Sequence, residues 1–313
     1  MLDKNLSKEV FLEVKLTDCY TLTEGKALMS GTEALVRLLL EQSRIDRLNG
    51  LRTKGLVSGY PGSPLGGLDI ALGKAHAFLD EEEIHFQPAV NEELAATALW
   101  GSQHINLYDN PDIQGVFSMW YGKGPGLDRA MDALRHANQG GVAPHGGMVI
   151  AVGDDPTGKS STLAYQSDQN FHSLGIPYFF PKNVSDIIPM GLEAFALSRY
   201  SGCCVGLKIV VDTADSNAVV DMSKLRPSLP ILKPNSLVHV TKHDPASVRD
   251  SKLHDLRLPA VQTWCDNSKN VTQVYLPAKK GETRLGIIGV GKIANEVNEA
   301  LISLLPERGK KNT

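Results

Sequence analysis

The sequence predicts an α/β fold, a doubly wound and mostly parallel sheet with helices on both faces. Short strand-like apolar runs alternate with helix-like segments over residues 31–211, and this alternation is typical of a parallel sheet wrapped by helices. Loops rich in glycine and proline follow several of the runs, at the edge where open α/β sheets bind ligands. The expected strands are 55–59, 84–86, 115–119, 148–152 and 206–211, and the expected helices are 31–45, 68–79, 184–200 and two that begin near residues 92 and 126.

The first of these helices has a start signal of its own. Ser30 and Glu33 have the spacing of a capping box, in which each side chain accepts a hydrogen bond from the other residue's backbone N–H. Leucine and valine recur between residues 35 and 40, so the helix that follows is expected to have an apolar side.

Composition favours a globular protein with ample material for a core. The chain has 313 residues, of which 42% are hydrophobic, and 32 basic residues stand against 35 acidic ones. A balance this even creates no field that attracts nucleic acid or an anionic membrane. Residues 1–20 alternate charged and apolar side chains, which fits no signal or transit sequence, and no window reaches the length of a membrane span. We therefore expect a cytoplasmic protein that binds neither nucleic acid nor membrane.

Cysteine and histidine spacing predicts no metal site in this chain. No C-x-x-C pair occurs among the four cysteines, so the usual ligand pairs of zinc and iron–sulfur sites are missing. Cys203 and Cys204 lead into an apolar run and are expected to be buried thiols. His85, His145 and His172, near the expected edge of the sheet, have no metal-binding spacing.

Glu92 is the acidic residue that we most expect to be buried. On a helix it shares a face with apolar residues, whereas Glu93 falls on the flank. The apolar residues on that face are Ala95, Ala96 and Leu99. The alternative is that Glu92, with Asn91 as N-cap, simply complements the helix dipole in the first turn.

Several motifs in a fixed order resemble one known family. They are Tyr60-Pro61-Gly62-Ser63-Pro64, His85-Phe86-Gln87-Pro88, Val90-Asn91-Glu92, Met119-Trp120-Tyr121-Gly122-Lys123-Gly124-Pro125-Gly126, Gly153-Asp154-Asp155, Lys159-Ser160-Ser161-Thr162, Ser198-Arg199-Tyr200-Ser201-Gly202-Cys203 and Asp212-Thr213-Ala214-Asp215-Ser216. Over about residues 20–222 the chain resembles the indolepyruvate ferredoxin oxidoreductase branch of the 2-oxoacid:ferredoxin oxidoreductase group. The resemblance implies the thiamine-diphosphate-binding fold and, within it, the module that binds the aminopyrimidine.

The resemblance implies that the cofactor is thiamine diphosphate and that Glu92 is catalytic. The base that deprotonates C2 of the cofactor is its own 4′-imino group, which forms when N1′ is hydrogen-bonded to an acid. A glutamic acid in an apolar pocket suits this role, because desolvation favours sharing of the proton with N1′.

Two loops are implied to contact the cofactor. The residues expected over its thiazolium and the substrate are Tyr60, Pro61, Gly62, Ser63 and Pro64, and those expected near its pyrimidine are Lys123, Gly124, Pro125 and Gly126. Glycines in the second loop would permit close approach of the backbone. The Ser63 hydroxyl would hydrogen-bond the 2-oxoacid or serve only the turn, and Lys123 would pair with a substrate carboxylate or simply be exposed.

The implied reaction is oxidative decarboxylation of an indolepyruvate-like or other 2-oxoacid to an acyl-CoA, with electrons passed to ferredoxin. The chain contains no G-D-G…N motif, so the diphosphate and Mg²⁺ site and the iron–sulfur clusters are expected on other domains or subunits. A diphosphate-binding partner and an oligomer are therefore expected, and the chain is expected to be inactive alone. The alternative is a non-catalytic fragment or structural subunit.

The same reasoning divides the chain into four parts. They are an N-terminal arm (1–22), the pyrimidine-binding α/β domain (23–225), a linker or extended arm (226–282) and the truncated start of a second α/β domain that resembles the C-terminal domain of transketolase (283–313). Four prolines, at positions 227, 230, 234 and 245, suggest the linker. A strand over 284–290 and a helix over 293–305 are expected in the last part.

A P-loop NTPase is the third alternative. Residues 153–160 satisfy G-x-x-x-x-G-K-[ST], and Asp212 ends a strand-like run that resembles a Walker B strand. Asp154, Asp155 and Pro156 argue against it, because two acidic side chains would repel phosphate and proline lacks a backbone donor. Another glycine pattern, Gly289-Val290-Gly291, is interpreted as a tight turn and not as a dinucleotide fingerprint.

Overall fold

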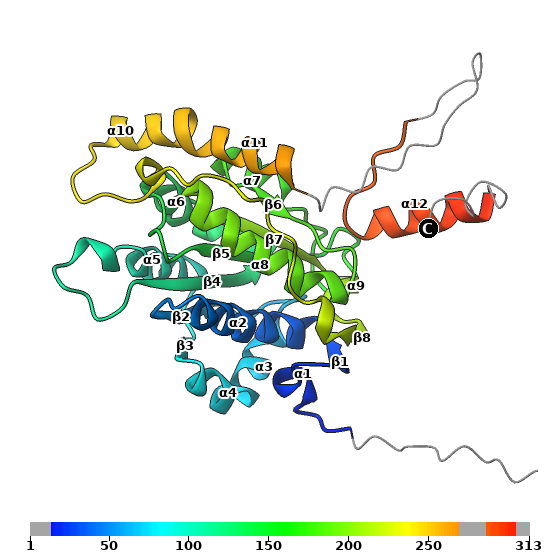
Figure 1. Cartoon of the computed structure of the whole chain (residues 1–313). Helices are drawn as coiled ribbons and strands as arrows, with labels where there is room; N and C mark the ends of the chain where they lie inside the picture. The colour runs from blue at the N-terminus through cyan, green and yellow to red at the C-terminus, as the bar shows by residue number, and fades with distance from the viewer. Residues whose placement is uncertain (1–13, 269–285, 305–313) are drawn as a thin grey trace, which may run out of the picture.

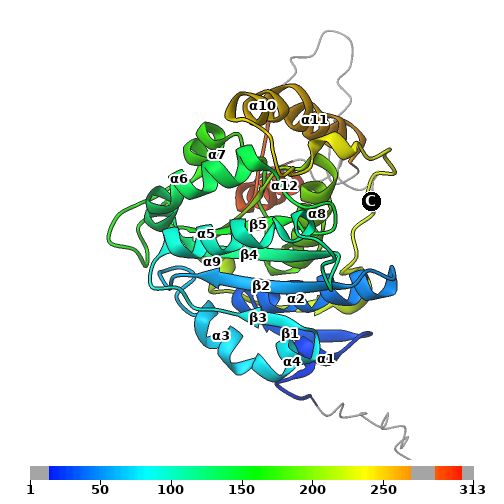
Figure 2. The same cartoon turned by 90° about the vertical axis from the view of Figure 1, so that its left-hand side faces the viewer.

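A parallel sheet forms the centre of the computed structural model, which describes residues 14–268 and 286–304. Its six strands lie in the order β3-β2-β4-β5-β7-β6, and every neighbouring pair is parallel (Figures 1 and 2). The strands are β2 (Thr53–Gly59), β3 (Ile84–Phe86), β4 (Gly115–Lys123), β5 (Met148–Asp154), β6 (Tyr178–Phe179) and β7 (Val205–Val210). With helices on both faces, this confirms the predicted fold class.

Helices cover the two faces of the sheet. On one face lie α2 (Gly31–Leu48), α3 (Leu68–Lys74), α4 (His76–Glu81) and α8 (Val184–Ser201), and on the other lie α5 (Glu92–Ser102), α6 (Gly124–Gly140) and α7 (Asp168–Leu174). The remaining elements are α1 (Asp18–Thr21), η1 (Ile105–Leu107), α9 (Val211–Ala214), η2 (Met222–Lys224), η3 (Ser236–Val238), α10 (Ala246–Ser251), the π-helix η4 (Lys252–Arg257), α11 (Leu258–Asn267), α12 (Lys292–Leu304) and a two-stranded antiparallel sheet of β1 (Lys26–Ser30) and β8 (Asn217–Asp221).

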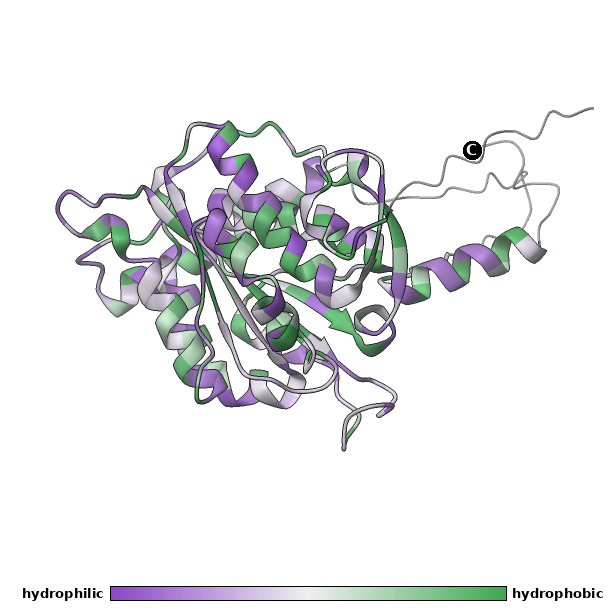
Figure 3. Cartoon of the chain, turned by 90° about the horizontal axis from the view of Figure 1, so that it is seen from below, coloured by the Kyte–Doolittle hydropathy of each residue, from purple (hydrophilic) through white to green (hydrophobic). Residues whose placement is uncertain are grey.

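Successive residues of the central strands feed two separate cores. In β4, Met119 and Tyr121 pack with α2 and α8, whereas Trp120 between them packs with α5 and α6. All three are fully buried. Because both faces are covered, these strands are apolar throughout instead of alternating with polar residues. By contrast, α12 lies to one side of the sheet and carries bands of hydrophilic and hydrophobic residues (Figure 3).

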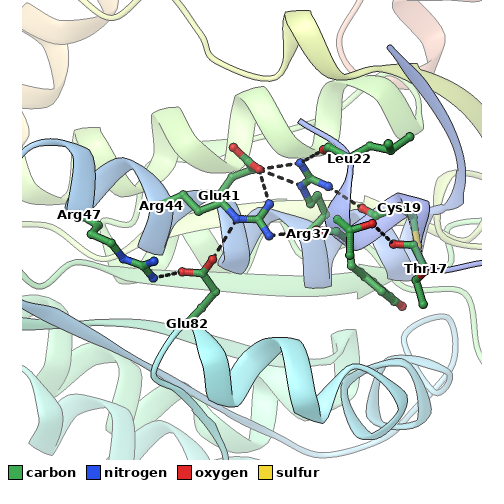
Figure 4. A network of polar contacts seen from close by, with 10 residues as sticks. Thr17, Cys19, Leu22, Arg37, Glu41, Arg44, Arg47 and Glu82 are labelled. Carbon is green, nitrogen blue, oxygen red and sulfur yellow. Dashed lines mark hydrogen bonds and ion pairs between the residues drawn. The ribbon is translucent and has the colours of Figure 1, made fainter. Parts of the chain in front are cut away.

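The capping box predicted at the start of α2 is present. Ser30 Oγ accepts from the backbone N–H of Glu33 at 3.2 Å, and Glu33 Oε2 accepts from the N–H of Ser30 at 2.8 Å. Further along α2, the fully buried Arg37 donates to Glu41 Oε1 and to the backbone oxygen of Cys19 (Figure 4). The network continues through Arg44 to Glu82 after α4, so α2 holds the segment before β1 and the end of α4 together.

Some expected elements differ from the structure by more than a few residues at their ends. The expected helix 68–79 is two helices, α3 and α4, that meet at Ala75, whose φ of −88° and ψ of 5° interrupt the helix. Strand β4 runs on to Lys123, and α6 begins at Gly124, since Pro125 is tolerated in a first helical turn. The strand expected over 284–290 was wrong for its described part, because 286–290 is irregular.

Residues 246–267, inside the expected linker, are helical. They form α10, η4 and α11 and lie beside α6 and α8 (Figure 1). Residues 226–245 contain only the short helix η3. In residues 14–268 and 286–304, no helix combines the length and the apolar character that a membrane crossing needs.

The order of strands creates a switch point between β2 and β4. From β2 the chain continues to β3 on one side, and from β4 it continues to β5 on the other. The connection through α3 and α4 lies on one face of the sheet and that through α6 lies on the opposite face. Open α/β sheets bind ligands in the crevice outside the carboxyl ends of two such strands. The loops after β2 and β4, at Tyr60 and Gly124, are the two loops implied to contact a cofactor.

Candidate active site at the carboxyl edge of the sheet

Glu92 lies at the first position of α5 with its side chain turned inward. Asn91 caps the helix, because its Oδ1 accepts from the backbone N–H of Leu94 at 2.8 Å. The side chain of Glu92 is only 10% exposed, while Glu93 beside it is exposed. The prediction that Glu92 is the buried acid is confirmed, together with the helix-face assignment behind it.

The start of α6 closes around the carboxyl group of Glu92. A Cβ added at Gly126 would lie 2.8 Å from Glu92 Oε1 and 2.8 Å from its Cγ, so a larger residue here would displace the side chain of Glu92. Arg129, one turn further along α6, places Nε 3.8 Å from Glu92 Oε2. The indole of Trp120 donates to the backbone oxygen of Glu92 at 3.0 Å and fixes the start of α5 against β4.

The turn after β2 packs on the end of β4. A Cβ at Gly62 would lie 2.8 Å from Cδ of Lys123, so the aliphatic stem of this half-buried lysine rests on the glycine. The N–H of Tyr60 donates to the backbone oxygen of Tyr121 at 3.2 Å. Tyr60 is 40% exposed at the rim. The turn at 60–64 and the loop at 123–126 are thus in direct contact.

A third loop, after β5, completes this edge. Pro64 packs on Gly153, where a Cβ would lie 2.9 Å from the proline ring. Ser63 Oγ donates to Ser160 Oγ at 2.5 Å, and Ser161 Oγ donates to the backbone oxygen of Ser63 at 3.2 Å. The Ser63 hydroxyl therefore has a protein partner, as a turn residue would.

Asp155 organises the loop after β5 from inside. Its carboxylate accepts backbone N–H groups from Lys159 at 2.9 Å, from Ser160 at 2.7 Å and from Ser161 at 2.8 Å. Burial favours the protonated acid, but these donors outweigh it and hold the pKa of Asp155 below its usual range. In a P-loop, such amides cradle phosphate. Here a carboxylate of the same chain occupies them, Lys159 pairs with Asp212 at 3.4 Å, and residues 156–167 form no helix. These contacts argue against phosphate binding.

A buried ionic cluster lies behind this loop. Asp154 Oδ2 accepts the backbone N–H and the hydroxyl of Ser167 at 2.7 and 2.8 Å and lies 3.4 Å from Nζ of Lys208. Burial raises the pKa of Asp154, although these partners act in the opposite direction. Lys208 also contacts Asp168 at 2.5 Å. The cluster links the end of β5 to the interior of β7 and to the start of α7.

The structure brings the predicted residues together in two contacts, Gly62 with Lys123 and Gly126 with Glu92. In the described part of the chain, no hydrogen bond joins Glu92 to the turn at 60–64, so residues 123–126 connect them. Sequence reasoning missed Arg129 and the structural role of Asp155. Arg129 could have been predicted, because it follows Gly126 by three residues and so lies on the same side of a helix. No local sequence pattern indicated the role of Asp155.

Comparisons with known proteins place this edge in context. The chain is 26% identical over 219 residues to indolepyruvate oxidoreductase subunit IorA of Pyrococcus abyssi and, over the same length, 26% identical to IorA of Pyrococcus horikoshii. Each match covers 68% of this chain and 29% of the relative, so the aligned part spans under a third of these proteins. No family model matches the chain.

A solved structure shares the fold. It is a 2-oxoglutarate:ferredoxin oxidoreductase from Magnetococcus marinus with 2-oxoglutarate, coenzyme A and succinyl-CoA bound. The match has a TM-score of 0.58 and covers 91% of this chain and 52% of that chain, at 17% sequence identity. At this identity the match shows the fold.

Proposed function

We propose that the chain supplies the pyrimidine side of a shared thiamine-diphosphate site. Its homology to the IorA subunits supports the 2-oxoacid:ferredoxin oxidoreductase family that the motifs predicted. The observation that carries the proposal is Glu92, a buried carboxyl group at a helix N-terminus, beside the switch point of the sheet and lodged against Gly126. The substrate would be an indolepyruvate-like 2-oxoacid and the product an acyl-CoA.

The residues at this edge suit the pyrimidine side of the cofactor. At Gly62, Gly124 and Gly126 the side chains of Lys123, Tyr165 and Glu92 pack directly on the backbone, which draws the two loops together. The buried apolar face of α5 gives the carboxyl group of Glu92 apolar surroundings. When bound, thiamine diphosphate supplies the nucleophilic carbon and the electron sink for decarboxylation. Glu92 would hold a proton at N1′, and Arg129, 3.8 Å away, would keep the carboxyl group oriented. Lys123 would orient the substrate carboxylate, with its stem supported by Gly62.

The remaining machinery would come from elsewhere. In the described residues, no group of three or more His, Cys, Asp or Glu side chains is arranged to hold a metal. Because the sequence contains no G-D-G…N motif and no C-x-x-C pair, we propose that the diphosphate with its Mg²⁺, the iron–sulfur clusters and the docking of coenzyme A and ferredoxin belong to further domains or subunits. Exposed apolar side chains rim the Glu92 edge and suit contact with such a partner; they are Tyr60, Val90 and Leu94.

The test compares Glu92→Gln with Glu93→Gln in the enzyme assembled with its diphosphate-binding partner. Gln keeps the shape but shares no proton with N1′, so hydrogen–deuterium exchange at C2 of the bound cofactor should slow by about 10² to 10⁴. Glu93→Gln should change little, since Glu93 is exposed. If exchange is unchanged in both variants, the thiamine proposal is wrong. If only Glu93→Gln slows it, the catalytic acid is misassigned.

A further inference from the structure

A large pocket lies at the opposite end of the sheet from Glu92. Its volume is about 750 Å³, within the range of small-molecule sites. One wall is formed by the C-terminal halves of α2 and α8, which lead to the amino ends of β2 and β7. The other wall is the proline-rich segment 226–236, which runs past α8 (Figure 1). It is therefore a separate site from the proposed cofactor site.

The pocket has an apolar and aromatic lining. Tyr200 and Trp264 lie side by side in it, with ring centroids 5.4 Å apart and planes tilted by 46°. The indole N–H of Trp264 donates to Glu193 Oε1 at 3.0 Å, which fixes the ring. Leucines of α8 and of segment 226–236 complete the surface. Such a lining fits a flat hydrophobic body.

One buried polar group in the lining lacks a partner. His239 is 8% exposed, and its Nδ1 has no hydrogen-bond partner in the part of the chain that the structure describes. A buried polar nitrogen without a partner costs free energy, about 1–3 kcal/mol. Burial also lowers the pKa of His239 to about 4, so the ring is neutral near pH 7. The ring belongs to the lining of the pocket, where a bound ligand would change its surroundings.

The charged groups in the lining favour an anion. The described lining contains two guanidinium groups, Arg199 and Arg226, and one carboxylate, Asp46. Asp46 is already saturated, since it accepts from both terminal nitrogens of Arg199, at 2.6 and 2.7 Å, and from Gln42 and Thr53. Arg226 has no salt-bridge partner among the described side chains and is exposed at the mouth.

We propose that this pocket binds a small aryl carboxylate, with its ring against the apolar wall that Tyr200 and Leu229 help to form and its carboxylate toward Arg226. The pocket lies across the sheet from Glu92, so its ligand would not contact the proposed cofactor site. This binding does not depend on the thiamine site, so binding of the aryl carboxylate to the pocket can be tested by itself.

The experiment titrates the purified chain with indole-3-acetate and, as the matched neutral compound, with indole-3-ethanol. The acid should bind saturably and about tenfold more tightly than the alcohol, since a charge-assisted contact would be lost. Arg226→Gln should reduce the difference, and Leu229→Glu, which places a carboxylate in the wall, should weaken the acid most. Lys233→Gln is the control, because Lys233 is exposed on the same segment outside the lining.

Nuclear magnetic resonance of histidine labelled at the ring carbons locates the ligand. The resonances of His239, identified by their loss in His239→Gln, should shift on titration. Any one of four outcomes would refute the proposal. The acid does not bind saturably, or it binds no more tightly than the alcohol. Alternatively, neither Arg226→Gln nor Leu229→Glu changes the affinities, or binding leaves the resonances of His239 unshifted. Calorimetry of Leu229→Glu with circular dichroism on the same sample separates loss of binding from loss of fold.

Discussion

Gly126 of α6 lies directly against the carboxyl group of Glu92 on α5. A methyl group in place of its hydrogen would approach Oε1 to 2.8 Å, closer than side-chain carbons tolerate, so the acid would have to move. The two helix starts therefore act as one unit, in which the glycine determines where the carboxyl group lies.

We expect Gly126→Ala to impair catalysis more than stability in the assembled enzyme. Displacement of a catalytic group by about 1 Å typically costs on the order of 10²-fold in rate. Turnover of the 2-oxoacid and urea unfolding are the two measurements. Gly101→Ala is the matched control, because Gly101 lies on the same helix as Glu92 with open space around its Cβ position. Equal turnover in both variants would show that Glu92 needs no exact position.

A second prediction concerns nucleotides. Since the N–H groups of Lys159, Ser160 and Ser161 are occupied by Asp155, ATP or GTP with Mg²⁺ should give no saturable isotherm in calorimetry. Lys159→Ala should leave the calorimetric trace unchanged. A micromolar isotherm that disappears in Lys159→Ala would establish a P-loop and reverse this assignment.

A third prediction concerns the helices after residue 245. Arg257, at the end of the π-helix, is fully buried and donates to four backbone oxygens; they belong to Val238, Asn138, Gln139 and Gly140. Three of these are the last carbonyl groups of α6, which have no partner within the helix. Arg257→Met should lower the free energy of unfolding by roughly 3 kcal/mol or more, because several buried acceptors lose a charged donor.

Urea unfolding of Arg257→Met measures this change, and Arg52→Met, at an exposed arginine, serves as the control. Limited proteolysis should also cut the Arg257 variant within 246–267 faster than the wild type. Equal stability of the two variants would mean that residues 246–267 are an attached arm and not part of the α/β unit.

Sequence patterns predicted the parts of the fold that rest on local signals. The capping box at Ser30 and the inward face of Glu92 follow from spacing within one helix, and both are confirmed. Strand β6 was missed because two residues, Tyr178 and Phe179, carry no period and pair only with β7. The helices at 246–267 were missed because Arg257 secures them through carbonyl groups about 118 residues earlier.

The site shows the same division. The loops at 60–64 and 123–126 were predicted from motif order to lie at one edge, and the structure brings them into contact. The structural role of Asp155, by contrast, depends on three amides that fold back onto its carboxylate. Sequence order gives no information on such a reversal. The role of Glu92 stays a prediction, although its burial is confirmed.

The last prediction concerns pH and His239. Burial lowers the pKa of His239 from 6.5 to about 4. The nearby charges of Arg257, His145 and Lys252 act in the same direction, and a hydrogen bond with the backbone of Val142 opposes them. The unfolded chain therefore takes up a proton on this residue near pH 6.5 while the native chain does not, so stability falls as pH falls from about 6.5 to about 4 and changes no further below that. The full effect is at most roughly 3 kcal/mol.

Urea unfolding between pH 4 and pH 7.5 measures the slope in the wild type, in His239→Gln and in the control His243→Gln, whose histidine is exposed. Because Gln does not titrate, the stability difference between the wild type and His239→Gln should shift in favour of the variant as pH falls through this window. His243→Gln should run parallel to the wild type. A constant difference between the wild type and His239→Gln at every pH would show that His239 takes up its proton as readily in the native chain as in the unfolded one.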